Sequence, residues 1–217
     1  TEHSSVIGNL GFGGALFDWD GDRDLDLFIA SQGYGNRGIS PACIYENRSS
    51  PAAPSFVPIP EHCGDRPEMP HSGFGLDLEG DGFHELLMTG TTMMEVHRFH
   101  PERAVIDLRA LVPAHDGRAN CNPGAAVSMD FNWDGLVDIM LGCQHGPVSR
   151  PPNATFHLVF LQTETGEFRF LDRLEEGLED DILLDAQGVT LALGGADVNQ
   201  DGLMDLIVCE DHMRRDL

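Results

Sequence analysis

The sequence predicts an all-β protein, and three observations support that fold class. One pattern occurs four times: an apolar run, a short loop dense in acidic residues, and a second apolar run, which is typical of a β-hairpin. The loops begin at Asp18, Asp77, Asp130 and Asp197, at intervals of roughly 50 to 70 residues, the scale of a repeated supersecondary unit. Glycine (25) and proline (13) are frequent among the 217 residues, as expected of a chain with many turns.

Short apolar segments between turn signals predict the individual strands. Each of the first three units has two strands flanking its acidic loop and two further strands after them, and the fourth unit has the flanking pair alone. The predicted strands are 12–17, 25–30, 42–45 and 56–59; then 75–78, 85–89, 94–99 and 105–108; then 125–129, 137–141, 155–161 and 167–171; then 190–196 and 204–209.

The segments between these strands carry glycine, proline or charge. Residues 32–40, 61–71, 113–123 and 146–154 are predicted as loops, and 163–166 as a tight hairpin turn. The acidic stretch 174–187 lengthens the last interval and is predicted as an interruption that holds a loop or a short helix.

Four short strands in each interval match one blade of a β-propeller. Such a sheet cannot bury both faces alone, so neighbouring units must stack. We therefore expect a single propeller region over 1–217, with units at about 12–60, 73–112, 124–172 and 190–217. The fourth unit stops after its second strand, so we expect a portion of a larger propeller, or one completed by another polypeptide, in preference to a closed four-bladed ring.

The acidic loops predict bound cations. The first loop has aspartates at 18, 20, 22, 24 and 26, and these five carboxylates in nine residues would repel one another unless a positive charge lay among them. Ca²⁺ takes six to eight oxygen ligands with flexible geometry. Four loops with the same offsets predict up to four Ca²⁺ ions, in a structural role because little room remains for a substrate.

The overall charge excludes two classes of partner. The formal net charge is −23, and the four loops hold 15 of the 36 acidic residues. Such a chain would be repelled by nucleic-acid backbones and by anionic membrane surfaces. No apolar run approaches the length needed to cross a bilayer, so this segment is not expected to insert into a membrane.

The five cysteines contain no CxxC pair, which argues against a zinc or thioredoxin-like site. Cys43 and Cys63 flank a loop and could form a disulfide. Cys143 and Cys209 lie in predicted buried strands, where we expect free thiols. Since five is odd, at least one cysteine must be free or bonded elsewhere. The segments starting at Asn47 and Asn153 match the acceptor pattern for N-glycosylation, 47–49 and 153–155.

At these motifs the chain resembles the FG-GAP/VCBS repeat family, the integrin-α-like β-propellers. Residues 12–15, Phe-Gly-Gly-Ala, match the first half of the family signature, and 197–206 match the Asp-x-Asn-x-Asp-Gly-x-x-Asp-Leu half. The resemblance spans all four units. It implies a calcium ion in each hairpin loop, an extracellular or secreted location (periplasmic or at the cell surface in a bacterium), and a role in adhesion or recognition of a protein or glycan.

The resemblance also implies the calcium ligands. Each loop would supply four side chains and one backbone carbonyl. The side-chain ligands would be Asp18, Asp20, Asp22 and Asp26; Asp77, Glu79, Asp81 and Glu85; Asp130, Asn132, Asp134 and Asp138; and Asp197, Asn199, Asp201 and Asp205, with the carbonyls of Asp24, Phe83, Leu136 and Leu203.

Two loops depart from the family pattern. Loop one has Arg23 where the other loops have Gly82, Gly135 and Gly202, so it is expected to turn differently, because glycine permits a positive φ. Loop two has the longer acids Glu79 and Glu85, so its site is expected to be the weakest or the most distorted.

A second function remains an alternative to recognition. Some relatives in this family are polysaccharide lyases, so the chain could belong to a carbohydrate-active enzyme that uses loop residues such as His71 and His115 for acid–base catalysis. His97 and His100 are expected at strand or surface positions, and Trp19 and Trp133 are expected to be packing residues and not a sugar platform.

Overall fold

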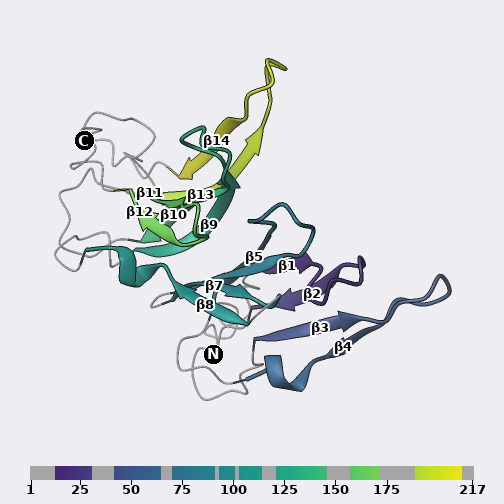
Figure 1. The fold of residues 1–217 in the computed structure, drawn as a ribbon. Coiled ribbons are helices and arrows are strands. Elements are labelled where there is room, and N and C mark those ends of the chain that lie inside the picture. The colour runs from purple at the N-terminus through teal and green to yellow at the C-terminus, as the bar shows by residue number, and fades with distance from the viewer. Residues whose placement is uncertain are drawn as a thin grey trace, which may run out of the picture. The chain divides into compact units, whose positions relative to one another are not determined.

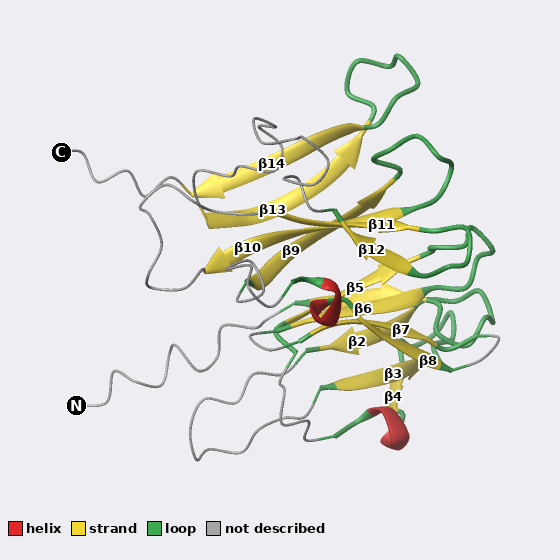
Figure 2. Cartoon of the chain, turned by 60° about the vertical axis from the view of Figure 1, so that its left-hand side comes forward, coloured by secondary structure: helices red, strands yellow, loops and turns green. Residues whose placement is uncertain are grey.

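The computed structural model describes residues 13–30, 42–64, 70–90, 93–100, 103–113, 121–145, 157–171 and 189–211. In this part of the chain the regular structure is β-strand apart from short 3-10 turns, and the strands form four antiparallel sheets (Figures 1 and 2). The all-β prediction is confirmed. The predicted interruption at 174–187 and the predicted loop at 32–40 lie outside the described residues, as does the loop at 146–154. Contacts divide the chain into two compact units, Thr1–Ile106 and Asp107–Leu217.

The first unit holds two four-stranded sheets, each with its strands in sequence order. The first sheet is β1 (Gly14–Phe17), β2 (Asp26–Ile29), β3 (Cys43–Asn47) and β4 (Phe56–Pro58), followed by the 3-10 turn η2 (Pro60–His62); the second is β5 (Ser72–Leu76), β6 (Glu85–Thr89), β7 (Met94–Arg98) and β8 (Ala104–Asp107).

The second unit repeats this plan once and then begins it again. The 3-10 turn η3 (Arg109–Leu111) precedes a sheet of β9 (Asn122–Met129), β10 (Asp138–His145), β11 (His157–Gln162) and β12 (Phe168–Phe170), and a two-stranded sheet follows with β13 (Val189–Ala196) and β14 (Asp205–Asp211). Each predicted pair flanking an acidic loop is therefore a hairpin, and the predicted turn at 163–166 closes with Thr163 N–H donating to the Glu167 carbonyl at 2.8 Å.

The start of the fifth strand was predicted wrongly. The prediction was 75–78, whereas β5 runs over Ser72–Leu76. The two glycines of this strand allow it to pack closely: a Cβ on Gly75 would lie 2.6 Å from the Cβ of Phe17, and one on Gly73 would overlap the ring of Phe28. β5 packs directly against the first sheet, and the close approach leaves no room for side chains at these two positions, so the strand includes the two glycines.

Each unit has its own apolar core. In the first, the largest fully buried side chains include Phe17, Phe28 and Leu86, which join one cluster drawn from both sheets. In the second, Met140 and Val159 pack with the half-buried Leu193 and Leu206 from the β13–β14 hairpin. Strands that flank the acidic loops contribute to both cores, together with later strands such as β3 and β11, so the loops begin and end next to packed structure.

Four of the five cysteines form disulfides. Cys43–Cys63 is one bridge, as the sequence allowed, and Cys121–Cys143 is the other. The prediction of free, buried thiols is wrong in part at both positions: Cys143 is not free, and Cys209 is free, as predicted, but not buried. Cys143 is buried but bonded, because the register of β10 on β9 brings it close to the start of β9; Cys209 is free but exposed on β14.

Candidate metal centre

The four acidic loops share one backbone conformation. Each is nine residues long, starting at Asp18, Asp77, Asp130 or Asp197, and we number its residues 1 to 9. The residues at positions 4 and 6 have positive φ in every loop. At position 4 the values are 80° for Gly21, 68° for Gly80, 66° for Trp133 and 62° for Gln200. At position 6 they are 73° for Arg23, 87° for Gly82, 87° for Gly135 and 88° for Gly202.

The prediction that loop one turns differently is therefore wrong. Arg23 adopts the left-handed conformation that glycine has in the other loops, at a cost of roughly 1 kcal/mol or more for a residue with a Cβ. The Arg23 N–H donates to Asp18 Oδ2 at 2.8 Å, and the carboxylates of the loop thus hold the backbone in this conformation.

One hydrogen-bond frame recurs in all four loops. The carboxylate at position 1 accepts the N–H of position 6, the carboxylate at position 5 accepts the N–H of position 7, and the carboxylate at position 9 accepts the N–H of position 2. These distances lie between 2.8 Å and 3.3 Å. The acids at positions 1, 5 and 9 thus shape the loop as well as supplying oxygens.

Loop one brings three acids into a tight cluster. One carboxylate oxygen from each of Asp18, Asp20 and Asp22 lies within 4.8 Å of the others, and this is the one such group found among the residues that the structure describes. Burial raises the pKa of Asp20, and the negative charges of Asp22 and Asp18 raise it further. Three hard oxygen donors this close are the ligand chemistry that Ca²⁺ prefers, so the residues present fit the ion.

The acids at position 9 tie the loops to the sheets. Asp26 accepts hydrogen bonds from the N–H of Trp19 (3.1 Å) in its own loop and of Asn47 (2.8 Å) at the end of β3. Asp138 likewise binds the N–H of Phe131 (2.9 Å) and of Gln162 (2.8 Å), the last residue of β11. Each carboxylate therefore joins the loop to the third strand of its sheet.

These buried acids have raised pKa values. Burial raises the pKa of Asp26 from 3.8 to about 6, and it also raises that of Asp138. Burial, together with a hydrogen bond and the negative charge from Glu79, raises the pKa of Glu85 from 4.5 to about 8. A bound cation would oppose these shifts, because it favours the ionised form.

Loop two carries its own positive partner. Glu79 Oε1 forms an ion pair with the Arg98 guanidinium of β7 at 2.6 Å. Arg98 was not among the residues singled out from the sequence; no signal in the loop motif itself points to it, because it lies on the third strand of the sheet. Its charge neutralises an acid that was assigned to the metal.

Loops three and four use an amide at position 3. Asn132 Nδ2 donates to Asp134 Oδ2, and Asn199 Nδ2 donates to Asp201 Oδ2, each at 2.9 Å. In loop one the corresponding residues are Asp20 and Asp22, and neither carboxylate can donate to the other when both are ionised. Loop one is therefore the most crowded with uncompensated negative charge.

The first two loops are in contact with each other. The ring of Phe83, at position 7 of loop two, occupies the space that a Cβ on Gly21 would fill. That ring packs on His100 with centroids 4.9 Å apart, and a His100 ring nitrogen hydrogen-bonds the Trp19 carbonyl at 3.1 Å. Phe83 was predicted as a carbonyl ligand, and its side chain has this second role because loop two packs against loop one.

Of the two loop histidines proposed for catalysis, the structure describes one. His71 N–H donates to the Thr89 carbonyl at 2.6 Å, and His115 lies outside the described residues. His97 is on β7, as expected of a strand position. Trp19 packs on Phe99, as predicted, but Trp133 is 66% exposed, so its prediction as a packing residue is wrong.

Comparison with models of known protein families found no match to this chain. Comparison with curated proteins found none either. Within the described residues, no helix has the length and apolar character that a membrane span requires.

Proposed function

We propose that the chain is a calcium-binding segment of a β-propeller of the FG-GAP/VCBS type, and that it serves extracellular recognition of a protein or glycan ligand. The observation that carries the proposal is the hydrogen-bond frame repeated in the four loops. Positions 4 and 7 differ in chemistry from loop to loop, whereas positions 1, 5 and 9 always supply a carboxylate. A constant set of oxygens on a constant backbone is what a cation site requires.

Electrostatics gives the ion its structural role. Two like charges about 4 Å apart repel by roughly 1 kcal/mol in water and about 4 kcal/mol near a protein surface. The three clustered carboxylates of loop one hold such pairs between β1 and β2. Asp18, Asp20, Asp22 and Asp26, with the Asp24 carbonyl, would hold Ca²⁺ there, and the ion would supply the charge that reverses the repulsion.

The loops differ in the competition that a cation meets. In loop two the Arg98 guanidinium already binds Glu79, which supports the expectation that site two is the weakest. In loops three and four the Asn132 and Asn199 amides donate to the acid at position 5 and must turn away to ligate through oxygen. We therefore rank loop one as the tightest site.

Two further observations support the proposal: the disulfides support an extracellular location, and the packing of the motif glycines supports the FG-GAP/VCBS type. Disulfides persist mainly in oxidising compartments, and the bridges Cys43–Cys63 and Cys121–Cys143 favour an extracellular chain. The glycines of the first half of the motif have a packing reason, since a Cβ on Gly14 would lie 2.7 Å from the Phe28 carbonyl oxygen.

The β14 edge supports completion of the array by another strand. In the other three sheets the second strand pairs with a third strand, and the register of this pairing is the same each time. Leu27 lies opposite Tyr45, Leu86 opposite His97, and Ile139 opposite Phe160. In the described chain β14 pairs only with β13. Ile207 is 45% exposed, whereas its counterparts in the other sheets, Phe28, Leu87 and Met140, are at most 2% exposed.

A strand added to β14 would cover Ile207, and its backbone would offer Asp205 the amide that Asn47 gives Asp26. Amide hydrogen exchange measured along β14 tests this. We expect fast exchange at the outward amides of the isolated chain and slow exchange once the completing polypeptide is present. Slow exchange in the isolated chain would show that the edge is already paired.

Calorimetric titration of the metal-free chain with CaCl2 tests the calcium proposal. We expect saturable binding at up to four sites, and loss of the tightest site in Asp18→Ala. Asp20→Asn gives loop one the amide of loops three and four, so it should weaken that site while keeping the loop folded. Glu164→Gln removes an exposed acid in the turn at 163–166, outside the acidic loops, and should leave binding unchanged. Absence of saturable binding, or equal titrations for all four proteins, would refute the proposal.

A further inference from the structure

Two consecutive residues of loop two, at positions 7 and 8, contact loop one at positions 4 and 1. The ring of Phe83 fills the space into which a Cβ on Gly21 would project. The backbone N–H of His84 donates to the Asp18 carbonyl at 3.4 Å. Asp18 is the first expected ligand of site one, and the Phe83 carbonyl is an expected ligand of site two. The same short segment of chain therefore belongs to one candidate site and supports the other.

The support from Phe83 distinguishes loop one from loop two. Gly21 and Gly80 both occupy position 4 of their loops and have positive φ values of 80° and 68°. A Cβ on Gly21 would overlap the Phe83 ring, whereas one on Gly80 would project into open space within the part of the chain that the structure describes. The left-handed turn of loop one is thus packed against a side chain from outside the loop.

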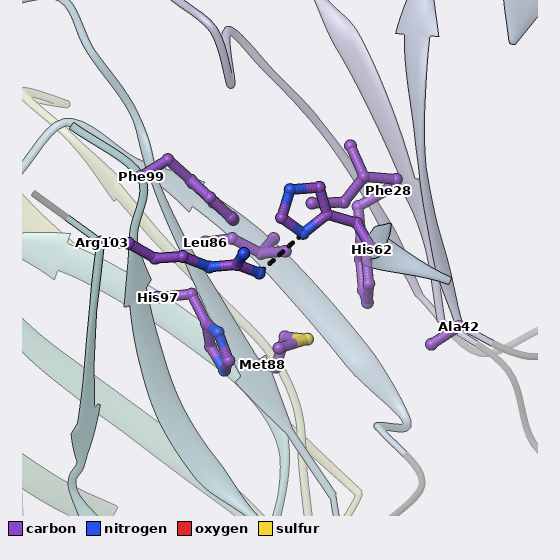
Figure 3. Close-up of a pocket in the computed structure, with 9 residues that line it drawn as sticks. Phe28, Ala42, His62, Leu86, Met88, His97, Phe99 and Arg103 are labelled. Atoms are coloured by element: carbon purple, nitrogen blue, oxygen red, sulfur yellow. Dashed lines mark hydrogen bonds between the residues drawn. The ribbon is translucent and has the colours of Figure 1, made fainter. Parts of the chain in front are cut away.

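The first turn of loop one is held by the sheets. The ring of Trp19, at position 2, packs on Phe99 and His62 at centroid distances of 6.0 Å and 5.1 Å. The Arg103 guanidinium donates to His62 Nδ1 at 3.0 Å and so holds that ring, as the dashed line in Figure 3 shows. The His100 ring, which packs on Phe83, also binds the Trp19 carbonyl. Loop one is therefore fixed by the sheets at position 2 and by loop two at position 4.

We propose that the calcium sites of loops one and two are coupled through Phe83, so that an ion in either loop makes the other loop bind its ion more tightly. This inference rests on the calcium proposal above. When the Phe83 carbonyl ligates an ion, the backbone that carries the ring is fixed, and the ring then holds the Gly21 turn in its binding conformation. Loop one consequently gives up less conformational freedom when it binds. Thermodynamic linkage requires the same factor in the opposite direction.

Charge alone would give coupling of the opposite sign. The four acids of loop two attract cations to this part of the molecule, and an ion among them would cancel part of that attraction for loop one. Salt weakens such an effect, because the Debye length falls from about 8 Å at 0.15 M to about 3 Å at 1 M ionic strength. Coupling through a packed ring does not depend on salt in this way. The sign of the coupling and its response to salt therefore separate the two causes.

The test is a CaCl2 titration of the whole chain followed by the amide resonances of each loop in nuclear magnetic resonance. The N–H groups of Arg23 and Gly82 bond to the first carboxylates of their loops and report on sites one and two. Asp81→Asn removes a charge from site two but keeps an oxygen for the Phe83 N–H. At calcium concentrations that leave the variant's site two empty, loop one should bind about fivefold or more weakly than in the wild type. Asp22→Asn should weaken loop two by the same factor.

Removal of the ring should abolish the coupling. Phe83→Ala keeps the backbone carbonyl, and in this background Asp81→Asn should no longer change the affinity of loop one. The matched control is Phe56→Ala, which removes a ring of similar exposure from β4 (39% against 36%) and should retain the coupling. Gly21→Ala should displace the ring and abolish the coupling as well, whereas Gly80→Ala adds a similar backbone strain without the overlap and should retain it.

Three results would overturn the proposal: equal affinity of loop one with site two intact and disabled, coupling that persists in Phe83→Ala, or coupling of negative sign that high salt removes. If neither loop binds calcium saturably, both this inference and the calcium proposal fail. Calcium binding at both loops without coupling refutes this inference alone, so the two failures are distinguishable.

Discussion

Adding CaCl2 to the metal-free chain is expected to raise its melting temperature by several degrees. A ligand that binds only the folded state stabilises it by about 2.7 kcal/mol at a free concentration one hundred times its Kd. For a chain of this size, 1 kcal/mol corresponds to roughly 2–4 °C, so even one occupied loop should be visible in a thermal melt. Identical melts with and without calcium would contradict a structural role for the ion.

The size of this calcium effect should depend on pH. The pKa of Asp26 is raised from 3.8 to about 6, and that of Glu85 from 4.5 to about 8. An acid whose pKa is higher in the folded state than in the unfolded state binds its proton more tightly when folded. Without calcium, the protonated acid therefore adds to the free energy of unfolding at low pH, and this contribution is lost as the pH rises through the folded-state pKa. Calcium requires the ionised form, so its stabilisation should be small at pH 5 and large at pH 8. Equal shifts at the two pH values would contradict this.

Truncating Phe17 is expected to be the most damaging single change to the first unit. The side chain is 0% exposed and packs against Phe99, so Phe17→Ala should lower the free energy of unfolding by about 3–5 kcal/mol through lost burial and the cavity left behind. Because Phe17 directly precedes Asp18, the first loop should lose its anchor at the same time.

The neighbouring residue offers a matched control. Leu16 is on the same strand but points the other way and is 58% exposed, so Leu16→Ala should change the free energy of unfolding by no more than about 0.5 kcal/mol. Urea unfolding of both variants measures the difference. Similar losses from the two substitutions would mean that the packing between the two sheets is not as described.

The four hairpins around the acidic loops followed from local patterns, whereas the start of β5 depended on its packing against the first sheet. Alternating apolar runs on either side of Asp130 and Asp197 specify hairpins whatever surrounds them, and the structure has them. The prediction that Arg23 would alter loop one failed for a physical reason. The carboxylate of Asp18 holds the N–H of Arg23, and that hydrogen bond offsets the strain of a positive φ.

The sequence by itself determined the strand pairs, the acidic loops and the oxygens that each loop can offer, because these depend on residues close together along the chain. Only the tertiary structure decided which loops keep their charge uncompensated. Arg98 reaches Glu79 from a third strand, and Asn47 reaches Asp26 from 21 residues away. The same holds for the bonded Cys143, since the pairing of β10 with β9 brings its partner Cys121 within reach.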